Sequence, residues 1–304
     1  MHRRDPSRVA SPRRAGRRAV QVPAAHGQDG IVTDIDSAGY QHIPDAEGGA
    51  AGRGWWDANA AEYLDEHGTF LGTAGFRWGP EGLSEAEAGL LGDVAGLRVL
   101  EVGAGAAQCS RWLATRGADV VATDISHGML ARAAALDTAA GVHVPVLQAD
   151  ARALPFADSA FDVVFTSFGA IPFVPDAARV HAEAARVLRP GGRWVFSVTH
   201  PVRWAFPDDP TARGLTADRS YFDRRPYVEK DAAGRVVYAE YHRTLGDHVR
   251  DVVAAGLRLH DVVEPEWPAW NREVWGGWGP ERGAFLPGTA VFVTRKPAAG
   301  TGTR

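Results

Sequence analysis

Short apolar runs alternate with longer stretches of helical spacing along the chain from Arg98 onward. Each run is about as long as a buried strand, and several of them end in glycine or aspartate. The expected strands cover residues 98–102, 119–123, 143–148, 161–166 and 193–199. Alternation of this kind is typical of a parallel sheet that is covered by helices on both faces.

The clearest helix is predicted from Asp176 to Leu188. Its apolar residues recur at helical spacing, and Pro190-Gly191-Gly192 follows as a stop signal. Beyond it, residues 200–243 break the alternation with arginines, aromatic residues and prolines, and Tyr227 to His242 predicts a hairpin that turns at Ala233-Gly234. We expect residues 200–243 to form an inserted lid. The remaining predicted elements are a helix near 246–256 and strands near 258–264 and 290–294.

The first 50 residues lack a sustained apolar period, so they bury too little surface to offset the entropy of ordering them. We therefore expect a disordered extension over residues 1–50 and one folded domain over residues 51–304. An organelle transit peptide is an alternative for the arginine-rich start, although serines are sparse there. Ahead of the sheet, Ala58 to Glu66 is predicted to be helical, and Ser84-Glu85-Ala86-Glu87 forms a capping box that opens another helix.

The composition, with 45% hydrophobic residues over 304 positions, allows a sizeable core. Seven arginines and one aspartate give the first 18 residues a charge of +6, which leaves −10 on the rest because the whole chain carries −4. An acidic body disfavours nucleic acid as a partner. The single cysteine, Cys109, excludes an internal disulfide and multi-cysteine metal sites, and it fits a core position. No apolar run is long enough for a membrane span, so we expect a cytoplasmic protein.

Candidate chemistry begins where the first strand ends, at Gly103-Ala104-Gly105-Ala106-Ala107. Glycines here let the backbone turn sharply and approach a ligand that a Cβ would repel. This turn also serves nicotinamide and flavin dinucleotide enzymes, and it occurs without any ligand. Glu101, however, stands two residues before the first glycine, where a carboxylate would repel a pyrophosphate and suit a cationic sulfonium with an amino group. Asp124 ends the next strand, at the spacing of a carboxylate that accepts hydrogen bonds from ribose hydroxyls.

Five sequence blocks together resemble the class I S-adenosylmethionine-dependent methyltransferases, in the branch that acts on small molecules. In chain order the blocks are VLEVGAGAA, VVATDIS, LQADARALPF, FDVVFTSF and VLRPGGRWVFSV, and the resemblance covers about residues 55–296. It implies a Rossmann-like, doubly wound α/β sheet of seven strands with the last strand antiparallel. It also implies that S-adenosylmethionine binds across the carboxyl ends of the first strands, as expected at a topological switch point.

The resemblance assigns the cofactor's methionine part to Glu101, Gly103, Ala104 and Gly105, and its ribose to Asp124. Ala107 replaces the family's third glycine, and we expect this small residue still to let helix and strand pack closely.

The remaining implied contacts surround the adenine and the methyl group. Ile125 and Met129 would flank the adenine, while Asp150 and the Ala151 N–H would bind its polar edge. Ser167 would lie beside the methyl group, and two aromatic residues of the N-terminal helix, Trp56 and Tyr63, would fold over the cofactor. Loop capping is the alternative for Asp150, and core packing is the alternative for both aromatic residues.

Methyl transfer from a sulfonium is an in-line displacement that mainly requires alignment, so a general base is optional. His200, directly after the fifth strand, is the candidate base for a hydroxyl acceptor; capping of the strand is its alternative role. No Asn-Pro-Pro-Tyr-type block follows the fourth strand, which disfavours methylation of a base's exocyclic amine.

Aromatic residues of the lid and of the tail predict a pocket for a flat or apolar small-molecule acceptor, or else a satellite core. The residues are Trp204, Phe206, Tyr221, Tyr227, Trp267, Trp270, Trp275 and Trp278. Arginines 203, 219, 224 and 225 either bind an acidic group or form an exposed charged loop. The expected function is O-, N- or C-methylation of a small molecule. The alternatives are a non-catalytic cofactor-binding module, an NAD-dependent oxidoreductase, and a methyltransferase for protein or nucleic acid.

Overall fold

The structure is a computed structural model, and it describes residues 35–298. Seven strands form the main sheet in the order β4-β3-β2-β5-β6-β10-β9, and all neighbours are parallel except at β10, which runs antiparallel to β6 and β9. The strands are β2 (Arg98–Val102), β3 (Asp119–Asp124), β4 (Val146–Gln148), β5 (Phe161–Thr166), β6 (Leu188–Thr199), β9 (Arg258–Val263) and β10 (Thr289–Arg295). The predicted α/β class, strand number and antiparallel last strand are confirmed.

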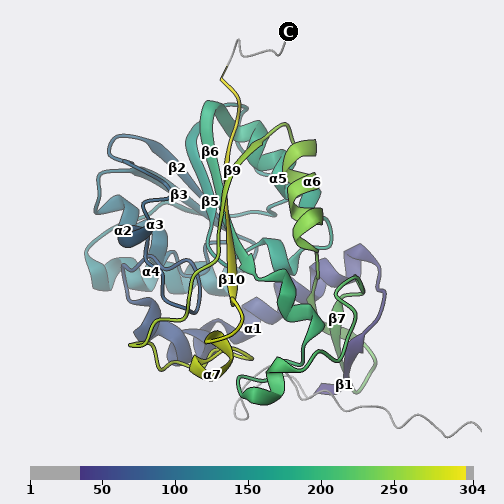
Figure 1. Cartoon of the computed structure of the whole chain (residues 1–304). Coiled ribbons are helices and arrows are strands. Elements are labelled where there is room, and N and C mark those ends of the chain that lie inside the picture. Colours follow the sequence, from purple (N-terminus) through teal and green to yellow (C-terminus); the bar gives the residue numbers. More distant parts are fainter. Residues whose placement is uncertain (1–34, 299–304) are drawn as a thin grey trace, which may run out of the picture.

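Helices cover both faces of this sheet (Figure 1). On one side lie α5 (Ala177–Val187) and α6 (Leu245–Ala254), and on the other lie α2 (Glu85–Ala88), α3 (Gln108–Ala114) and α4 (His127–Ala140).

Consecutive strand residues enter opposite cores, because side chains alternate along a strand. Leu100 and Phe196 belong to the core beneath α5 and α6, whereas their neighbours Val99 and Val195 belong to the core that contains Leu113 of α3. The apolar runs of β2, β5 and β6 are therefore buried on both faces, as the pattern predicts, whereas the edge strands β4 and β9 are largely exposed.

Strand β6 begins at Leu188, five residues earlier than predicted. Gly191 takes a φ of +84° and the pairing with β5 shifts register between Phe161 and Val163, so Pro190-Gly191-Gly192 lies within an irregular part of the strand. The helix before it does end near the expected position, at Val187.

A second sheet of three antiparallel strands lies beside the first, in the order β1-β7-β8. Its hairpin, β7 (Tyr227–Asp231) and β8 (Val236–Glu240), is the one predicted within residues 200–243. Two short 3-10 helices, η2 (Pro201–Ala205) and η3 (Ala212–Leu215), precede the hairpin. The outer strand β1 (Ile35–Tyr40) comes from the N-terminal region, so these two distant segments form one unit.

The expected disorder of residues 1–50 is wrong for residues 35–50, which form β1 and the start of α1 (Asp45–Leu71); residues 1–34 lie outside the described residues. Sequence patterning predicted only Ala58 to Glu66 of this 27-residue helix. The rest of α1 was not predicted because its glycines lower the helix propensity of that part of the sequence. At Gly48 the reason for glycine is close packing, since a Cβ there would lie 1.8 Å from the Tyr241 hydroxyl.

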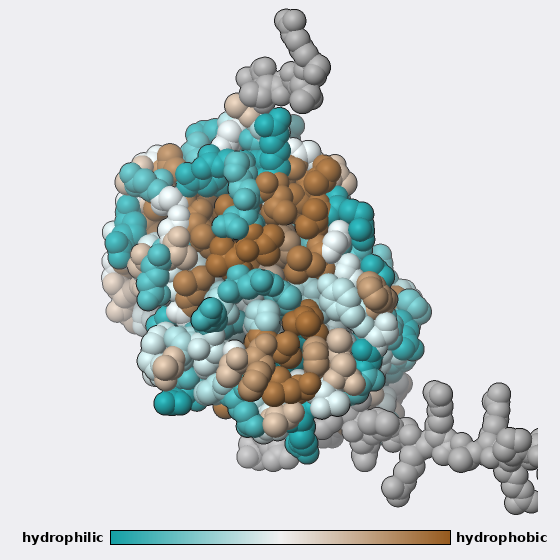
Figure 2. Space-filling view, in the orientation of Figure 1, coloured by the Kyte–Doolittle hydropathy of each residue, from teal (hydrophilic) through white to brown (hydrophobic). Residues whose placement is uncertain are grey.

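Two short elements complete the fold: η1 (Ile171–Phe173) and α7 (Pro280–Gly283). The capping box at Ser84 is present, although the helix that it opens, α2, is only four residues long. On the face drawn in Figure 2, two hydrophobic areas are separated by a hydrophilic band, and Val253 of α6 is among the exposed apolar residues. Within residues 35–298, no helix has the length and apolar character to cross a membrane.

Arg111 joins three segments on the α3 side of the sheet and is fully buried. Its guanidinium donates to Asp137 Oδ1 of α4 (2.9 Å) and to the carbonyls of Thr73 (2.7 Å) and Ala106. Asp137 is itself buried, so each charge depends on the other for compensation.

We expect Arg111→Ala to lower the free energy of unfolding by about 3–5 kcal/mol, because the substitution leaves the Asp137 carboxylate buried without its cation. Urea denaturation measures this loss. The control is Arg132→Ala on the exposed side of α4, for which we expect a change within about 0.5 kcal/mol. Equal losses for the two variants would contradict the role of the buried pair.

Candidate functional site

A cavity of about 560 Å³ lies where the carboxyl ends of the parallel strands meet α1 and the inserted segment. Residues that follow successive strands line it in spatial order: Asp150 after β4, Asp124 at the end of β3, Gly103 after β2, Ser167 after β5 and Thr199 at the end of β6. Neighbouring strands lie about 4.8 Å apart, so Thr199 stands about 10 Å from Gly103, across the tip of β5. The cavity therefore extends from the loops after β2 and β3 to the end of β6.

The glycine turn after β2 forms as predicted. Gly103 and Gly105 have φ angles of +67° and +54°, and Ala107 takes the same left-handed region at +57°. Backbone approaches closely here: a Cβ on Gly169 would lie 2.1 Å from the Gly103 carbonyl oxygen. A larger residue at Gly103 or Gly169 would push the two loops apart.

Asp124 holds this turn through its carboxylate. One oxygen accepts a hydrogen bond from Gly105 N (2.7 Å) and the other accepts one from Ser126 N (2.8 Å). Burial raises the pKa of Asp124, while these backbone hydrogen bonds oppose that rise. The Ile125 N–H also approaches this carboxylate, which offers about four acceptor positions, so Asp124 keeps about one for a hydroxyl group of a ligand in the cavity.

Eleven of the predicted site residues line the cavity. They are Trp56, Tyr63, Gly103, Ala104, Gly105, Asp124, Ile125, Met129, Asp150, Ala151 and Ser167. Asp150 is paired with Arg152 through hydrogen bonds of 2.7–3.2 Å, an interaction that lowers the pKa of Asp150. Trp56 and Tyr63 also pack edge to face, with ring centroids 5.3 Å apart, so they serve as wall and as packing partners at once.

Glu101 differs from its prediction, because it is buried and does not line the cavity. Its Oε2 accepts from Ser110 N (3.0 Å) and from the Ser110 hydroxyl. Ala107 at the N-cap has no side chain that could cap α3, so Glu101 accepts a free N–H of the first turn instead. Burial raises the pKa of Glu101 to about 7, against the lowering effect of the Ser110 hydrogen bonds.

His200, the candidate base, also lies outside the cavity lining. Side chains alternate along β6, and Thr199 is the residue that faces the cavity, while the His200 side chain points elsewhere. Its Nδ1 accepts from Val202 N (3.1 Å) as the cap of η2, and its Nε2 lies 2.7 Å from Glu264 Oε1. His200 therefore caps the following helix η2 rather than the preceding strand, and its place outside the cavity lining argues against the role of base.

One face of α1 supplies residues that the sequence reasoning missed. Asn59, Glu66 and His67 line the cavity together with Trp56 and Tyr63, at offsets of three to four residues or their sums. This spacing in the sequence could have identified these residues as one face of a helix. Burial lowers the pKa of His67 to about 4, and its ring stacks on Trp275 at 3.7 Å, so it is neutral near pH 7.

The aromatic residues predicted for an acceptor pocket divide into two groups. Trp275 and Trp278 line the cavity, joined by the turn Gly276-Gly277. Trp204 and Tyr227 instead form a satellite core with Tyr238. Phe206, Tyr221, Trp267 and Trp270 do not line the cavity.

Among the four arginines proposed for an acidic group, only Arg203 reaches the cavity. Arg219 and Arg225 pair with Asp223, and Arg224 pairs with Asp247. Cys109, expected in the core, packs against the core below α3 and also touches the cavity.

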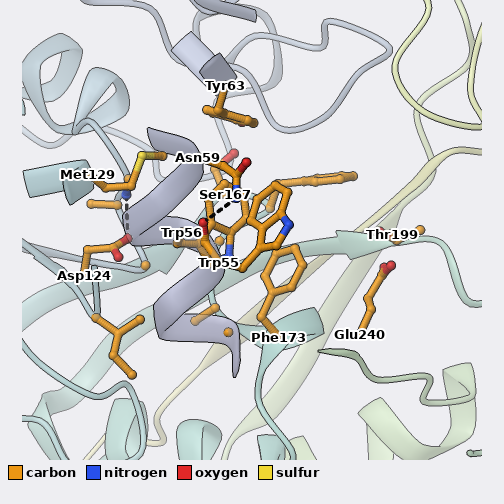
Figure 3. A pocket seen from close by; sticks show the side chains of 18 of the residues that line it. Trp55, Trp56, Asn59, Tyr63, Asp124, Met129, Ser167, Phe173, Thr199 and Glu240 are labelled. Atoms are coloured by element: carbon orange, nitrogen blue, oxygen red, sulfur yellow. Dashed lines mark hydrogen bonds between the residues drawn. The ribbon is translucent and has the colours of Figure 1, made fainter. Parts of the chain in front are cut away.

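Ionisable residues give the cavity a negative balance. Six carboxylates and four arginines are among its described lining residues, so its formal charge is −2 when all of them are ionised and His67 is neutral. Figure 3 shows Asp124 and Met129 on one side of Trp56, with Phe173, Thr199 and Glu240 on the other. Such a site favours a ligand with positive charge, and it has room for a second molecule beside the first.

Comparisons with known proteins show that this chain is similar to methyltransferases. Residues 100–196 match a family model described as "Methyltransferase domain". A demethylmenaquinone methyltransferase of Mycolicibacterium vanbaalenii is 48% identical over 98 residues, 32% of this chain and 40% of that protein. An uncharacterized protein of Mycobacterium tuberculosis is 41% identical over 97 residues, again 32% of this chain, and 35% of its own length. The matches thus span well under half of these relatives.

Solved structures extend the likeness to most of the fold. An S-adenosylmethionine-dependent methyltransferase from Mesorhizobium loti is 28% identical, with a TM-score of 0.55, covering 71% of this chain and all of that one. A 1,6-didemethyltoxoflavin-N1-methyltransferase from Burkholderia thailandensis, solved with S-adenosylhomocysteine, is 20% identical with a TM-score of 0.53, covering 86% of this chain and 95% of that one. The latter likeness concerns the fold alone.

The pH dependence of stability reports on Glu101. The pKa of Glu101 is about 7 in the folded protein, whereas its ordinary value is 4.5. The protonated Glu101 side chain therefore stabilises the fold at low pH, and this contribution declines as the pH rises from about 4.5 to 7. We expect the free energy of unfolding of the native protein, relative to Glu101→Gln, to fall by about 3 kcal/mol over this range. Urea denaturation at a series of pH values measures the difference.

The control is Glu87→Gln, on the surface. Capping hydrogen bonds from Ser84 lower the pKa of Glu87, so the native protein should gain stability relative to this variant as pH rises. Parallel pH trends for the two variants would contradict the buried state of Glu101.

Proposed function

We propose, from the premise that this chain belongs to the class I S-adenosylmethionine-dependent methyltransferases, that it methylates a small-molecule acceptor. The glycine turn after β2 and the Asp124 carboxylate, side by side at the floor of one cavity, carry this proposal. The family domain at residues 100–196 and the likeness to the Mesorhizobium loti enzyme support it.

The residues present fit S-adenosylmethionine. Its sulfonium and ammonium groups are cationic, and the lining has a formal excess of two negative charges. Asp124 has acceptor capacity left for a ribose hydroxyl. Ile125 and Met129 would offer apolar surface for the adenine, and Asp150 and Ala151, which line the same cavity, would meet its polar edge.

The bound cofactor supplies an electrophilic methyl group on a sulfonium, and the chain supplies alignment and an enclosed site. Gly103 and Gly105 bring backbone close to the ligand because they lack a Cβ. Trp56 and Tyr63 cover the cavity from α1 and exclude water. Ser167 donates its hydroxyl proton to the Arg77 carbonyl, which orients its oxygen toward the middle of the cavity.

A small molecule is the acceptor that the enclosure favours. Helix α1, the inserted hairpin and the Trp275–Trp278 turn wall the far side of the cavity, which limits access for a macromolecule. The relative from Mycolicibacterium vanbaalenii acts, by its name, on demethylmenaquinone rather than on a protein or nucleic acid, and this supports a non-macromolecular acceptor here. Oxygen, nitrogen or carbon can receive the methyl group in such a site.

We expect Asp124→Asn to weaken S-adenosylhomocysteine binding about 10- to 100-fold, because hydrogen bonds from hydroxyls to a charged acceptor contribute about 1.5–3 kcal/mol. Isothermal titration calorimetry measures the affinity. The control is Asp119→Asn at the opposite, exposed end of β3, which should bind within about twofold of the native protein. An unchanged affinity in Asp124→Asn would exclude this carboxylate as the ribose anchor.

The proposal as a whole is tested by binding and by transfer. Calorimetry with S-adenosylmethionine and, separately, with NAD should show heat for the first alone. Incubation with methyl-labelled S-adenosylmethionine and a cell extract of small metabolites should then yield a labelled product, identified by mass. Binding without transfer to any metabolite would favour a non-catalytic module, and binding of NAD alone would favour an oxidoreductase.

A further inference from the structure

The far side of the cavity from Asp124 contains a carboxylate that the steps above do not use. Glu240 is the last residue of β8, its side chain is only 9% exposed, and it lines the cavity. Figure 3 shows its carboxylate beside Phe173 and Thr199, away from Asp124 and Met129. We call this region, with Trp55 and Tyr238, the acceptor end of the cavity.

Glu240 has acceptor capacity to spare. Its nearest cation is Arg203, whose Nη2 lies 3.7 Å away, beyond the 2.7–2.9 Å of a charge-assisted hydrogen bond. Arg203 is closer to Asp208, at 3.2 Å. The Tyr238 hydroxyl gives Glu240 one hydrogen bond, whereas a carboxylate can accept about four.

Because Glu240 is buried, an acceptor position left without a donor costs free energy. Desolvation raises the pKa of Glu240, and a buried carboxylate is costly unless donors surround it. A ligand with an O–H or N–H at this position would supply the missing donor. A ligand carboxylate would meet Glu240 and Asp208 with Arg203 as the lining cation beside them, and the excess of one negative charge among these three residues disfavours anions.

Aromatic side chains make up the walls around Glu240. Trp55 and Tyr238 pack edge to face at 5.3 Å, Phe173 and Tyr238 at 6.1 Å, and Phe173 and Trp56 at 5.2 Å. These four rings form a continuous network from three separate elements, α1, η1 and β8. Aromatic walls favour a flat ring, which they contact by stacking or edge to face.

We propose that the methyl acceptor is a planar aromatic compound with a neutral O–H or N–H group, and that Glu240 accepts the hydrogen bond from that group. This inference rests on the proposed methyltransferase function and names its substrate class. Glu240 acts here as a specificity residue that orients the ring, while the displacement itself takes place nearer Ser167.

Paired aromatic probes test the inference without knowledge of the natural acceptor. Binding of 2-naphthol is compared with that of 2-methoxynaphthalene, and binding of indole with that of 1-methylindole; each pair differs by a capped donor. Isothermal titration calorimetry in the presence of saturating S-adenosylhomocysteine measures each affinity. We expect each uncapped probe to bind at least tenfold tighter than its capped partner, because the capped probe leaves Glu240 without a donor. The anion 2-naphthoate should bind more weakly than 2-naphthol.

Two variants assign the effect to one carboxylate. Glu240→Gln should lower the affinity for the uncapped probes about tenfold and leave the capped ones unchanged. Glu229→Gln is the control, because Glu229 is a buried carboxylate of the neighbouring strand β7 that does not line the cavity. It should keep the native preference. Circular dichroism and S-adenosylhomocysteine affinity verify that both variants are folded.

The outcomes separate this inference from the proposed function. Equal affinities for capped and uncapped probes, tighter binding of 2-naphthoate, or an undiminished preference in folded Glu240→Gln would each overturn the role of Glu240. The comparison of probe pairs on the native protein decides the matter even where the variant does not fold. Normal S-adenosylhomocysteine binding alongside any of these results leaves the methyltransferase proposal standing, whereas its absence overturns both.

Discussion

The hydrogen bonds that Asp124 accepts from Gly105 and Ser126 join two loops at the point where the chain builds its cavity. One loop follows β2 and the other follows β3, and Ala104 and Ala107 of the first loop also pack in a small apolar core with Ala122 of β3. A single carboxylate thus sets the width of the turn and presents its remaining lone pairs to a ligand. Any residue without two acceptor oxygens at this position would leave a backbone N–H of one loop unpaired.

Buried charges support this arrangement from behind. Glu101 caps α3 from the adjacent strand, and Arg111 ties the same helix to α4 and to the carbonyl of Ala106 in the glycine turn. Both residues lie behind the cavity wall and hold the turn in place. The hydrogen bonds from Ser110 to Glu101 and from Arg111 to Asp137 and Ala106 offset part of their desolvation cost.

The two ends of the cavity have different structural origins. The Asp124 end is built from loops at the carboxyl ends of the parallel strands, as in other doubly wound sheets. The acceptor end is built from α1, the inserted hairpin and the Trp275–Trp278 turn, segments that lie far apart in the chain. A shared sheet can therefore keep one cofactor chemistry while the added segments change the acceptor.

Local sequence patterns determined most strand positions, the glycine turn and the strand-end carboxylate Asp124, because these features act over a few neighbouring residues. The seven-stranded sheet with its antiparallel last strand was expected from the family resemblance instead. The local patterns did not determine which side of a strand end faces the cavity, so Thr199 faces it rather than His200. The glycine-rich length of α1, the pairing of β1 with β7 and the placement of Glu240 beside Phe173 depend on contacts between distant segments. Only the tertiary structure decides these features, since burial and close packing override what each segment would prefer alone.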